Sequence, residues 1–147
     1  YYNPFFNFVE SELFRIYEKF DSAFLLNAHT MESEIPEVNK YLEHNKRPDF
    51  CLGTNDMCSI DHALLTEFHS SLESHARDYI GSDVSIAIDR PFAGRAGLTR
   101  VFGRPQDGFN ALLLEINQGL YFSENGSDLE VINSLNSIIQ NTLDDVF

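Results

Sequence analysis

The chain has 147 residues, with 10 Lys or Arg against 23 Asp or Glu, so its formal net charge at pH 7 is −13. This length is typical of one domain, and 43% hydrophobic and 13% aromatic residues can fill a core, which excludes a disordered acidic tail. The negative charge argues against nucleic-acid binding, and the longest apolar runs are far shorter than the roughly 18–20 residues that cross a bilayer.

The first predicted elements are a helix and a strand. Asn3-Pro4 has the pattern of an N-cap followed by proline at the first helical position. Apolar side chains recur every three or four residues over 6–20, which predicts an amphipathic helix. The apolar run 23–28 predicts a buried strand that ends in His29-Thr30-Met31.

The middle of the chain predicts a loop, a short strand and a long helix. Residues 32–47 have turn chemistry and room for one short helix. Residues 50–53 are a short apolar run between turn signals, which predicts a strand. Ser59 is the expected N-cap of a helix over 60–80, which Gly81 ends.

The last elements complete an α/β pattern. Residues 84–88 predict a strand, so strand, helix and strand should form a parallel crossover unit. Residues 89–109 are rich in Gly and Pro and predict a long ordered loop, of the kind that is often functional. A strand over 111–116 follows, and the capping-box pattern of 127–130 predicts a final helix over 131–146.

His29 is the first residue whose position favours chemistry. It directly follows a predicted buried strand, and parallel α/β sheets place their binding crevices at the carboxyl ends of strands. The alternative is an imidazole that is only hydrogen-bonded at a strand end.

Glu115 is the second residue whose position favours chemistry, because it interrupts the apolar run ALLLEI. Burying an unpaired carboxylate is costly or raises its pKa, so a strand tolerates one chiefly where it is paired or used, for instance as a general base. The alternative places it near the strand end or on an exposed face.

The predicted loop holds four of the ten basic residues, namely Arg90, Arg95, Arg100 and Arg104. Guanidinium groups bind carboxylates through two parallel hydrogen bonds, so the cluster is a candidate carboxylate or anion site. Pairing with the acidic surface of the chain is the alternative.

The remaining histidines and the cysteines predict no site. His62, His69 and His75 lack the i, i+4 spacing of a helical zinc motif and are expected on a solvated face. Cys51 and Cys58 form a poor metal site and too small a set for a disulfide framework, which favours a reduced, cytoplasmic setting.

Four blocks together resemble the N-formylglutamate amidohydrolase family in order and spacing: NAHTM at 27–31, CLGTND at 51–56, RPFAGRAGLTRVFGRPQDG at 90–108 and ALLLEINQGLY at 111–121. The arrangement is similar to the C-terminal half of that family. The resemblance implies an α/β fold like that of zinc carboxypeptidases and aspartoacylase: a three-layer, phosphorylase/hydrolase-like arrangement with a mixed sheet and flanking helices, incomplete at the N-terminus.

The resemblance also implies roles for individual residues. His29 would be a zinc ligand, and Glu115 would be the general base that activates a zinc-bound water for amide hydrolysis. Arg95 and Arg100 are the preferred pair for a substrate carboxylate. Asn27 stands where the family often has an acidic residue, and Asp89 stands where Asn is expected.

The family's other two zinc ligands lie in a Pro-His-Ser-Gly-like segment, which is expected ahead of Tyr1. The chain is therefore expected to be one α/β domain, residues 1–147, from the C-terminal part of a longer hydrolase. Alone it should bind zinc weakly and hydrolyse nothing. His29 and Glu115 should lie close together at the same edge of one sheet.

The resulting hypothesis is a zinc-dependent amidohydrolase acting on a small acidic N-acyl amino acid such as N-formylglutamate. The alternative function is a non-catalytic α/β module that binds a small carboxylate or a protein partner through the arginine-rich loop. Neither hypothesis involves nucleic acid or a membrane, and assembly into a homo-oligomer is left open.

Overall fold

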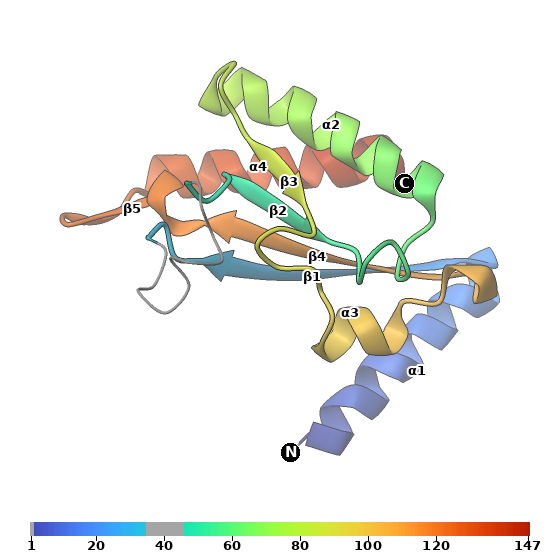
Figure 1. Ribbon diagram of the computed structural model, residues 1–147. Helices are drawn as coiled ribbons and strands as arrows, with labels where there is room; N and C mark the ends of the chain where they lie inside the picture. Colours follow the sequence, from blue (N-terminus) through green and yellow to red (C-terminus); the bar gives the residue numbers. More distant parts are fainter. Residues whose placement is uncertain (1, 35–45) are drawn as a thin grey trace.

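The computed structural model describes residues 2–34 and 46–147, and its middle layer is a four-stranded sheet (Figure 1). The strand order is β1 (Ala23–Met31), β4 (Phe109–Asn117), β2 (Phe50–Gly53) and β3 (Ile86–Ile88). β1 runs parallel to β4, whereas β2 runs antiparallel to β4 and parallel to β3, so the sheet is mixed.

Helices cover both faces of the sheet (Figure 1). One face carries α2 (His62–Ile80) and α4 (Leu129–Val146), and the other carries α1 (Tyr2–Phe20) and the short α3 (Gly97–Phe102). A small hairpin of β5 (Phe122–Ser123) and β6 (Gly126–Ser127) precedes α4. The expected α/β fold with a mixed sheet and flanking helices is confirmed.

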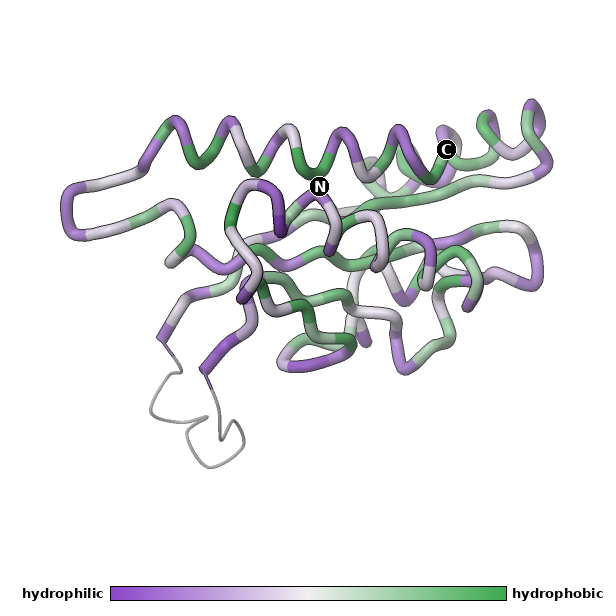
Figure 2. Tube along the Cα trace, turned by 90° about the horizontal axis from the view of Figure 1, so that it is seen from above, coloured by the Kyte–Doolittle hydropathy of each residue, from purple (hydrophilic) through white to green (hydrophobic). Residues whose placement is uncertain are grey.

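The position of β4 at the centre of the sheet explains why the sequence is largely apolar over residues 111–116. All nine of its residues are buried, because strands flank it on both edges and helices cover both faces. Leu112, Leu114 and Ile116 pack in the core beneath α2 and α4. Since side chains alternate along a strand, Glu115 points to the opposite face, which α1 and α3 cover in part. In Figure 2 the hydrophobic colour runs along the strands, and polar and apolar segments alternate along α4.

The predicted elements are present, with corrections at their ends. Asn3 is not an N-cap, because α1 already begins at Tyr2 and Asn3-Pro4 lies in its first turn, where proline removes no helical hydrogen bond. Asp61 caps α2 in place of Ser59, whose buried hydroxyl donates to the Ala111 carbonyl instead (2.8 Å). Gly81 ends α2 as expected.

Two further corrections concern the C-terminal half. Residues 89–109 are not one long loop, because they contain α3 and a 3₁₀ helix at Pro105–Asp107, and β4 starts at Phe109. The apolar side of α3 packs against α1 and the sheet, a tertiary contact that a six-residue helix does not announce in its sequence. Asp128, not Ser127, accepts the hydrogen bonds that cap α4.

The short helix expected within 32–47 falls mostly on residues 35–45, outside the described residues. Over the described ranges, no helix combines the length and the apolar character that crossing a membrane requires.

Candidate functional site

His29 and Glu115 stand opposite each other on the neighbouring parallel strands β1 and β4. Partners in register on adjacent strands point to the same face, and neighbouring strands typically lie about 4.7–4.9 Å apart. The sheet therefore brings together the two residues that the sequence places far apart. Both lie toward the carboxyl ends of their strands, where the imidazole is exposed and the carboxylate is buried.

Glu115 is a buried carboxylate that its surroundings leave incompletely bonded. It is 9% exposed, and its Oε2 has no hydrogen-bond partner among the described residues. Burial raises the pKa of Glu115, and the charges of His29 and Arg47 oppose that rise without cancelling it. A buried acid with a spare oxygen beside an exposed imidazole has the properties of a group that exchanges protons.

A hydrogen-bond chain fixes the orientation of His29. Asn27 Nδ2 donates to Thr99 Oγ1 (3.5 Å), which leaves Asn27 Oδ1 to accept from His29 Nε2 (3.1 Å). Because an amide oxygen only accepts, Nε2 carries a proton in this contact, so in the neutral ring Nδ1 is the nitrogen that offers a lone pair. Asn27 thus supplies the orienting contact at the position where the family resemblance leads one to expect an acid.

Cys51 is the second strand neighbour of Glu115, from β2. Its thiol is fully buried and donates to the Phe92 carbonyl (3.3 Å). Burial, together with the nearby Glu115 charge, raises the pKa of the Cys51 thiol to about 11. A raised pKa favours the protonated thiol near neutral pH, which makes Cys51 a weak nucleophile.

Arg47 is the residue of this site that sequence reasoning missed. It is only 5% exposed, its guanidinium lies 5.3 Å from the Phe92 ring centroid, and its Nη1 donates to the Glu32 carbonyl (3.0 Å). Its charge also acts on Glu115. The only available signal was an arginine just ahead of a buried strand, within a segment that otherwise has turn chemistry.

The arginine-rich segment is not a single cluster. Arg95 donates from Nε and Nη2 to the two carboxylate oxygens of Asp56 (2.6 and 2.7 Å), and Arg104 lies over the Phe109 ring. These hydrogen bonds lower the pKa of Asp56. Arg100, in the last turn of α3, is exposed and has no ion-pair partner among the described residues. For Arg95, pairing with the acidic surface is the arrangement found.

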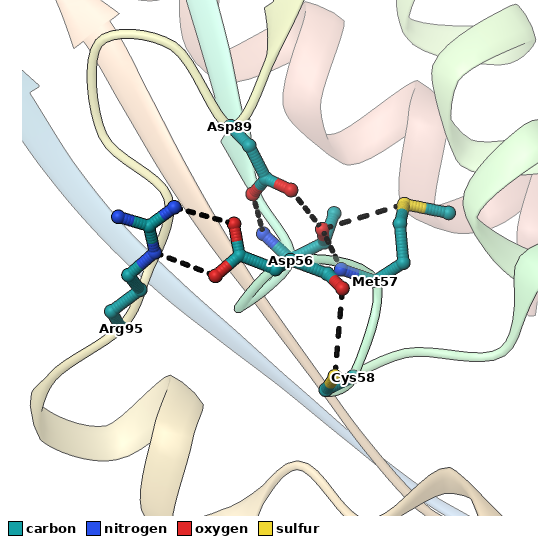
Figure 3. A network of polar contacts seen from close by, with 6 residues as sticks. Asp56, Met57, Cys58, Asp89 and Arg95 are labelled. Carbon is teal, nitrogen blue, oxygen red and sulfur yellow. Dashed lines mark hydrogen bonds and ion pairs between the residues drawn. The ribbon is translucent and has the colours of Figure 1, made fainter.

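The turn after β2 and the segment after β3 are joined by a network of polar contacts (Figure 3). Asp89 accepts from the Thr54 backbone N and Oγ1 (2.6 Å each), and Asn55 N donates to the Ala93 carbonyl (2.6 Å). The Arg95–Asp56 pair lies in the same network. The two segments are therefore held to each other at several points.

The three histidines of α2 are only in part a solvated face. His62 and His69 line a groove of about 220 Å³ beside β3, on the side of the sheet away from Glu115. His75 bonds Asp145 of α4 through Nε2 (2.8 Å), and Ser71 donates to the same Asp145 oxygen (2.7 Å). His75 therefore joins two helices instead of facing only solvent.

Over residues 2–34 and 46–147, no three His, Cys, Asp or Glu side chains gather as a metal-binding group. His29 offers one imidazole nitrogen, and its register partner on β4 is Glu115, whose Oε2 has no hydrogen-bond partner within the described ranges. Together they fit one ligand and one acid-base group of a zinc site, whose coordination shell would need further ligands.

Known proteins resemble this chain in sequence and in fold. The model of the family described as N-formylglutamate amidohydrolase matches residues 1–122. N-formylglutamate deformylases from Pseudomonas aeruginosa and Pseudomonas putida are 31% and 32% identical to it over 123 residues, which is 84% of this chain and 42% of each relative. The chain thus spans less than half the length of these curated relatives.

The crystal structure of N-formylglutamate amidohydrolase from Ralstonia eutropha JMP134 matches 99% of this chain and 50% of its own, with a TM-score of 0.78 and 22% identity. The gene product Atu2144 from Agrobacterium tumefaciens matches 97% of this chain and 50% of its own, with a TM-score of 0.53 and 13% identity. These structures share the fold. Since the family model covers residues 1–122 of 147, the chain belongs to the N-formylglutamate amidohydrolase family.

Proposed function

We propose that this chain supplies part of the active site of a zinc-dependent amidohydrolase that removes the formyl group from N-formylglutamate or a similar small acidic N-acyl amino acid. Family membership and the names of the two deformylases support the reaction and the substrate class. The observation that carries the proposal is the register pairing of exposed His29 with buried Glu115, whose Oε2 is unpartnered within the described part of the chain.

Each residue then has a defined task. His29 would bind zinc through Nδ1, with Asn27 holding the ring by its Nε2 proton. Zinc would supply a Lewis acid and a water of lowered pKa, with the remaining ligands coming from outside the described residues. Glu115 would accept at Oε2 a proton from the attacking water and pass it to the leaving amine. Burial moves its pKa toward neutrality, which suits a general base.

The substrate carboxylate would be held by arginine. Arg100 is exposed without an ion-pair partner in the described ranges, so it is available. Arg95 donates from Nε and Nη2 to Asp56, so a substrate carboxylate can take that two-point contact only by displacing Asp56. The free cysteines, including exposed Cys58, support the reduced, cytoplasmic setting as part of the proposal.

The test is formate release from N-formyl-L-glutamate by the protein that contains this chain, after chelation and again after zinc is restored. Zinc should restore activity, and Glu115→Gln should lower kcat by about 10²–10⁴ because the proton acceptor is lost. His29→Ala should abolish zinc-dependent activity. The matched control is Glu67→Gln, which replaces an exposed acid on α2 and should change neither kcat nor the restoration of activity by zinc.

The opposing outcomes are distinct. Full activity in Glu115→Gln would refute the general base. Zinc held by three ligands from the described residues would refute the assignment of His29 as a lone contributor. Binding of small carboxylates without zinc and without hydrolysis would favour the non-catalytic module.

A further inference from the structure

Arg95 already holds a carboxylate in the two-point geometry that a substrate carboxylate would require. Its Nε and Nη2 donate to the two oxygens of Asp56 at 2.6 and 2.7 Å (Figure 3). The side chains are 69% and 53% exposed, so the pair is open to solvent and to a dissolved ligand. Asp56 is therefore an internal mimic of the ligand class proposed for this site.

Asp56 is presented by a constrained turn and not by a freely moving loop. Asn55, Asp56 and Met57 are three successive residues with positive φ (51°, 56° and 65°), a conformation that non-glycine residues seldom adopt. Thr54 fixes this turn, because its Oγ1 accepts from Met57 N (2.8 Å) and donates to Asp89 (2.6 Å). Strained backbone of this kind persists only where surrounding contacts hold it.

Contacts also connect Arg95 to the proposed site. The preceding residue, Gly94, packs so closely on α3 that an added Cβ would lie 3.0 Å from Thr99 Cγ2. Thr99 accepts a hydrogen bond from Asn27, and Asn27 accepts one from His29. Arg95 thus belongs to the segment that lies over the face of the sheet to which His29 and Glu115 point.

We propose that Asp56 is a specificity-determining residue: its carboxylate occupies the Nε–Nη2 edge of the Arg95 guanidinium, and an acidic ligand gains the two-point contact at that edge only by displacing Asp56. This inference rests on the proposed function for the identity of the ligand. Asp56 weakens the binding of acidic ligands through Arg95 and leaves neutral ligands unaffected. Because an exposed ion pair is weak, the displacement costs an acidic ligand about two- to fivefold in affinity.

The first measurement is binding of glutarate, a dicarboxylate without a scissile amide, by calorimetry. Asp56→Asn should lower the Kd for glutarate about two- to fivefold. Arg95→Gln should not lower this Kd, and the double variant should have the same glutarate Kd as Arg95→Gln. Neutral glutaramide serves as the ligand control. Asp107→Asn, which removes the same charge from another exposed position, controls for the overall field and should leave the Kd unchanged.

A purely structural ion pair predicts the opposite sign, since Asp56→Asn and Arg95→Gln would then both raise the Kd. That result would overturn the inference, and so would an equal glutarate Kd in Asp56→Asn and wild type, or a gain that persists in the double variant. Formate release from N-formyl-L-glutamate, measured in parallel, tests the proposed function. If the protein hydrolyses N-formyl-L-glutamate but Asp56→Asn has the glutarate Kd of wild type, only the inference about Asp56 is refuted. If the Kd values follow the predicted pattern but no formate is released, only the proposed function is refuted.

Discussion

Replacing Glu115 by glutamine should relieve a stability penalty that grows with pH. The carboxylate is 9% exposed and its Oε2 has no hydrogen-bond partner among the described residues, so its charge is poorly solvated. Burial raises its pKa in the folded chain, with His29 and Arg47 opposing the rise. In the variant, Arg47 keeps its hydrogen bond to the Glu32 carbonyl, so it is not left without an acceptor.

The sign follows from proton linkage. A carboxyl whose folded pKa lies above its unfolded pKa of about 4.3 binds more protons when folded, so stability falls as pH rises through the window between the two pKa values. Below about pH 4 both states are protonated and the penalty is absent. Above the folded pKa the stability penalty of the ionised carboxylate is fully present. Each unit by which burial raises the pKa costs about 1.4 kcal/mol of stability in this range. At this chain length 1.4 kcal/mol corresponds to about 4–5 °C in Tm.

The assay is thermal and urea unfolding of both proteins in chelator between pH 4 and 8. The free energy of unfolding of Glu115→Gln minus that of wild type should increase across this range, by about 1.4 kcal/mol for each unit by which burial raises the pKa of Glu115. Glu67→Gln removes an equal charge from an exposed position on α2 and should give a flat difference. A Glu115→Gln difference that is constant, or that shrinks as pH rises, would show that the carboxylate is not destabilised by burial.

Three further expectations concern the scaffold. Phe68→Ala should lower the free energy of unfolding by about 3–5 kcal/mol in urea titrations, because Phe68 is fully buried in the core; a loss below 1 kcal/mol would contradict that. Gly53→Ala should cost about 1–3 kcal/mol, because an added Cβ would lie 2.8 Å from the Gly94 backbone N; unchanged chemical denaturation would show that the segments separate freely. Asp145→Asn should destabilise the chain at neutral pH but not in acid. Hydrogen bonds that Ser71 and His75 donate to Asp145 lower its pKa. The contribution of Asp145 to the free energy of unfolding is therefore present above the unfolded pKa and is lost as pH falls through the folded pKa. Equal loss at pH 7 and pH 3 would contradict this.

Local patterns in the sequence were sufficient for the main elements. An apolar run marks a buried strand because a strand between two helical layers has little polar surface, and so residues 50–53 and the core of β4 were correctly predicted. Glu115 stood out for the same reason, since a charge within such a run is costly. The ends of helices were less reliable. Asp61 caps α2 because the Ser59 hydroxyl is bonded to β4, a contact formed by residues 52 positions apart.

The sequence by itself determined that His29 follows an apolar strand, that Glu115 interrupts another, and that arginines concentrate between 90 and 104. Tertiary structure alone decided the rest. Strand register placed His29 opposite Glu115, and packing between segments brought Arg95 and Asp56 together as an ion pair. The physical reason is that burial leaves a periodic trace along the chain, whereas pairing between strands and between charges depends on which distant segments the packed core brings into contact.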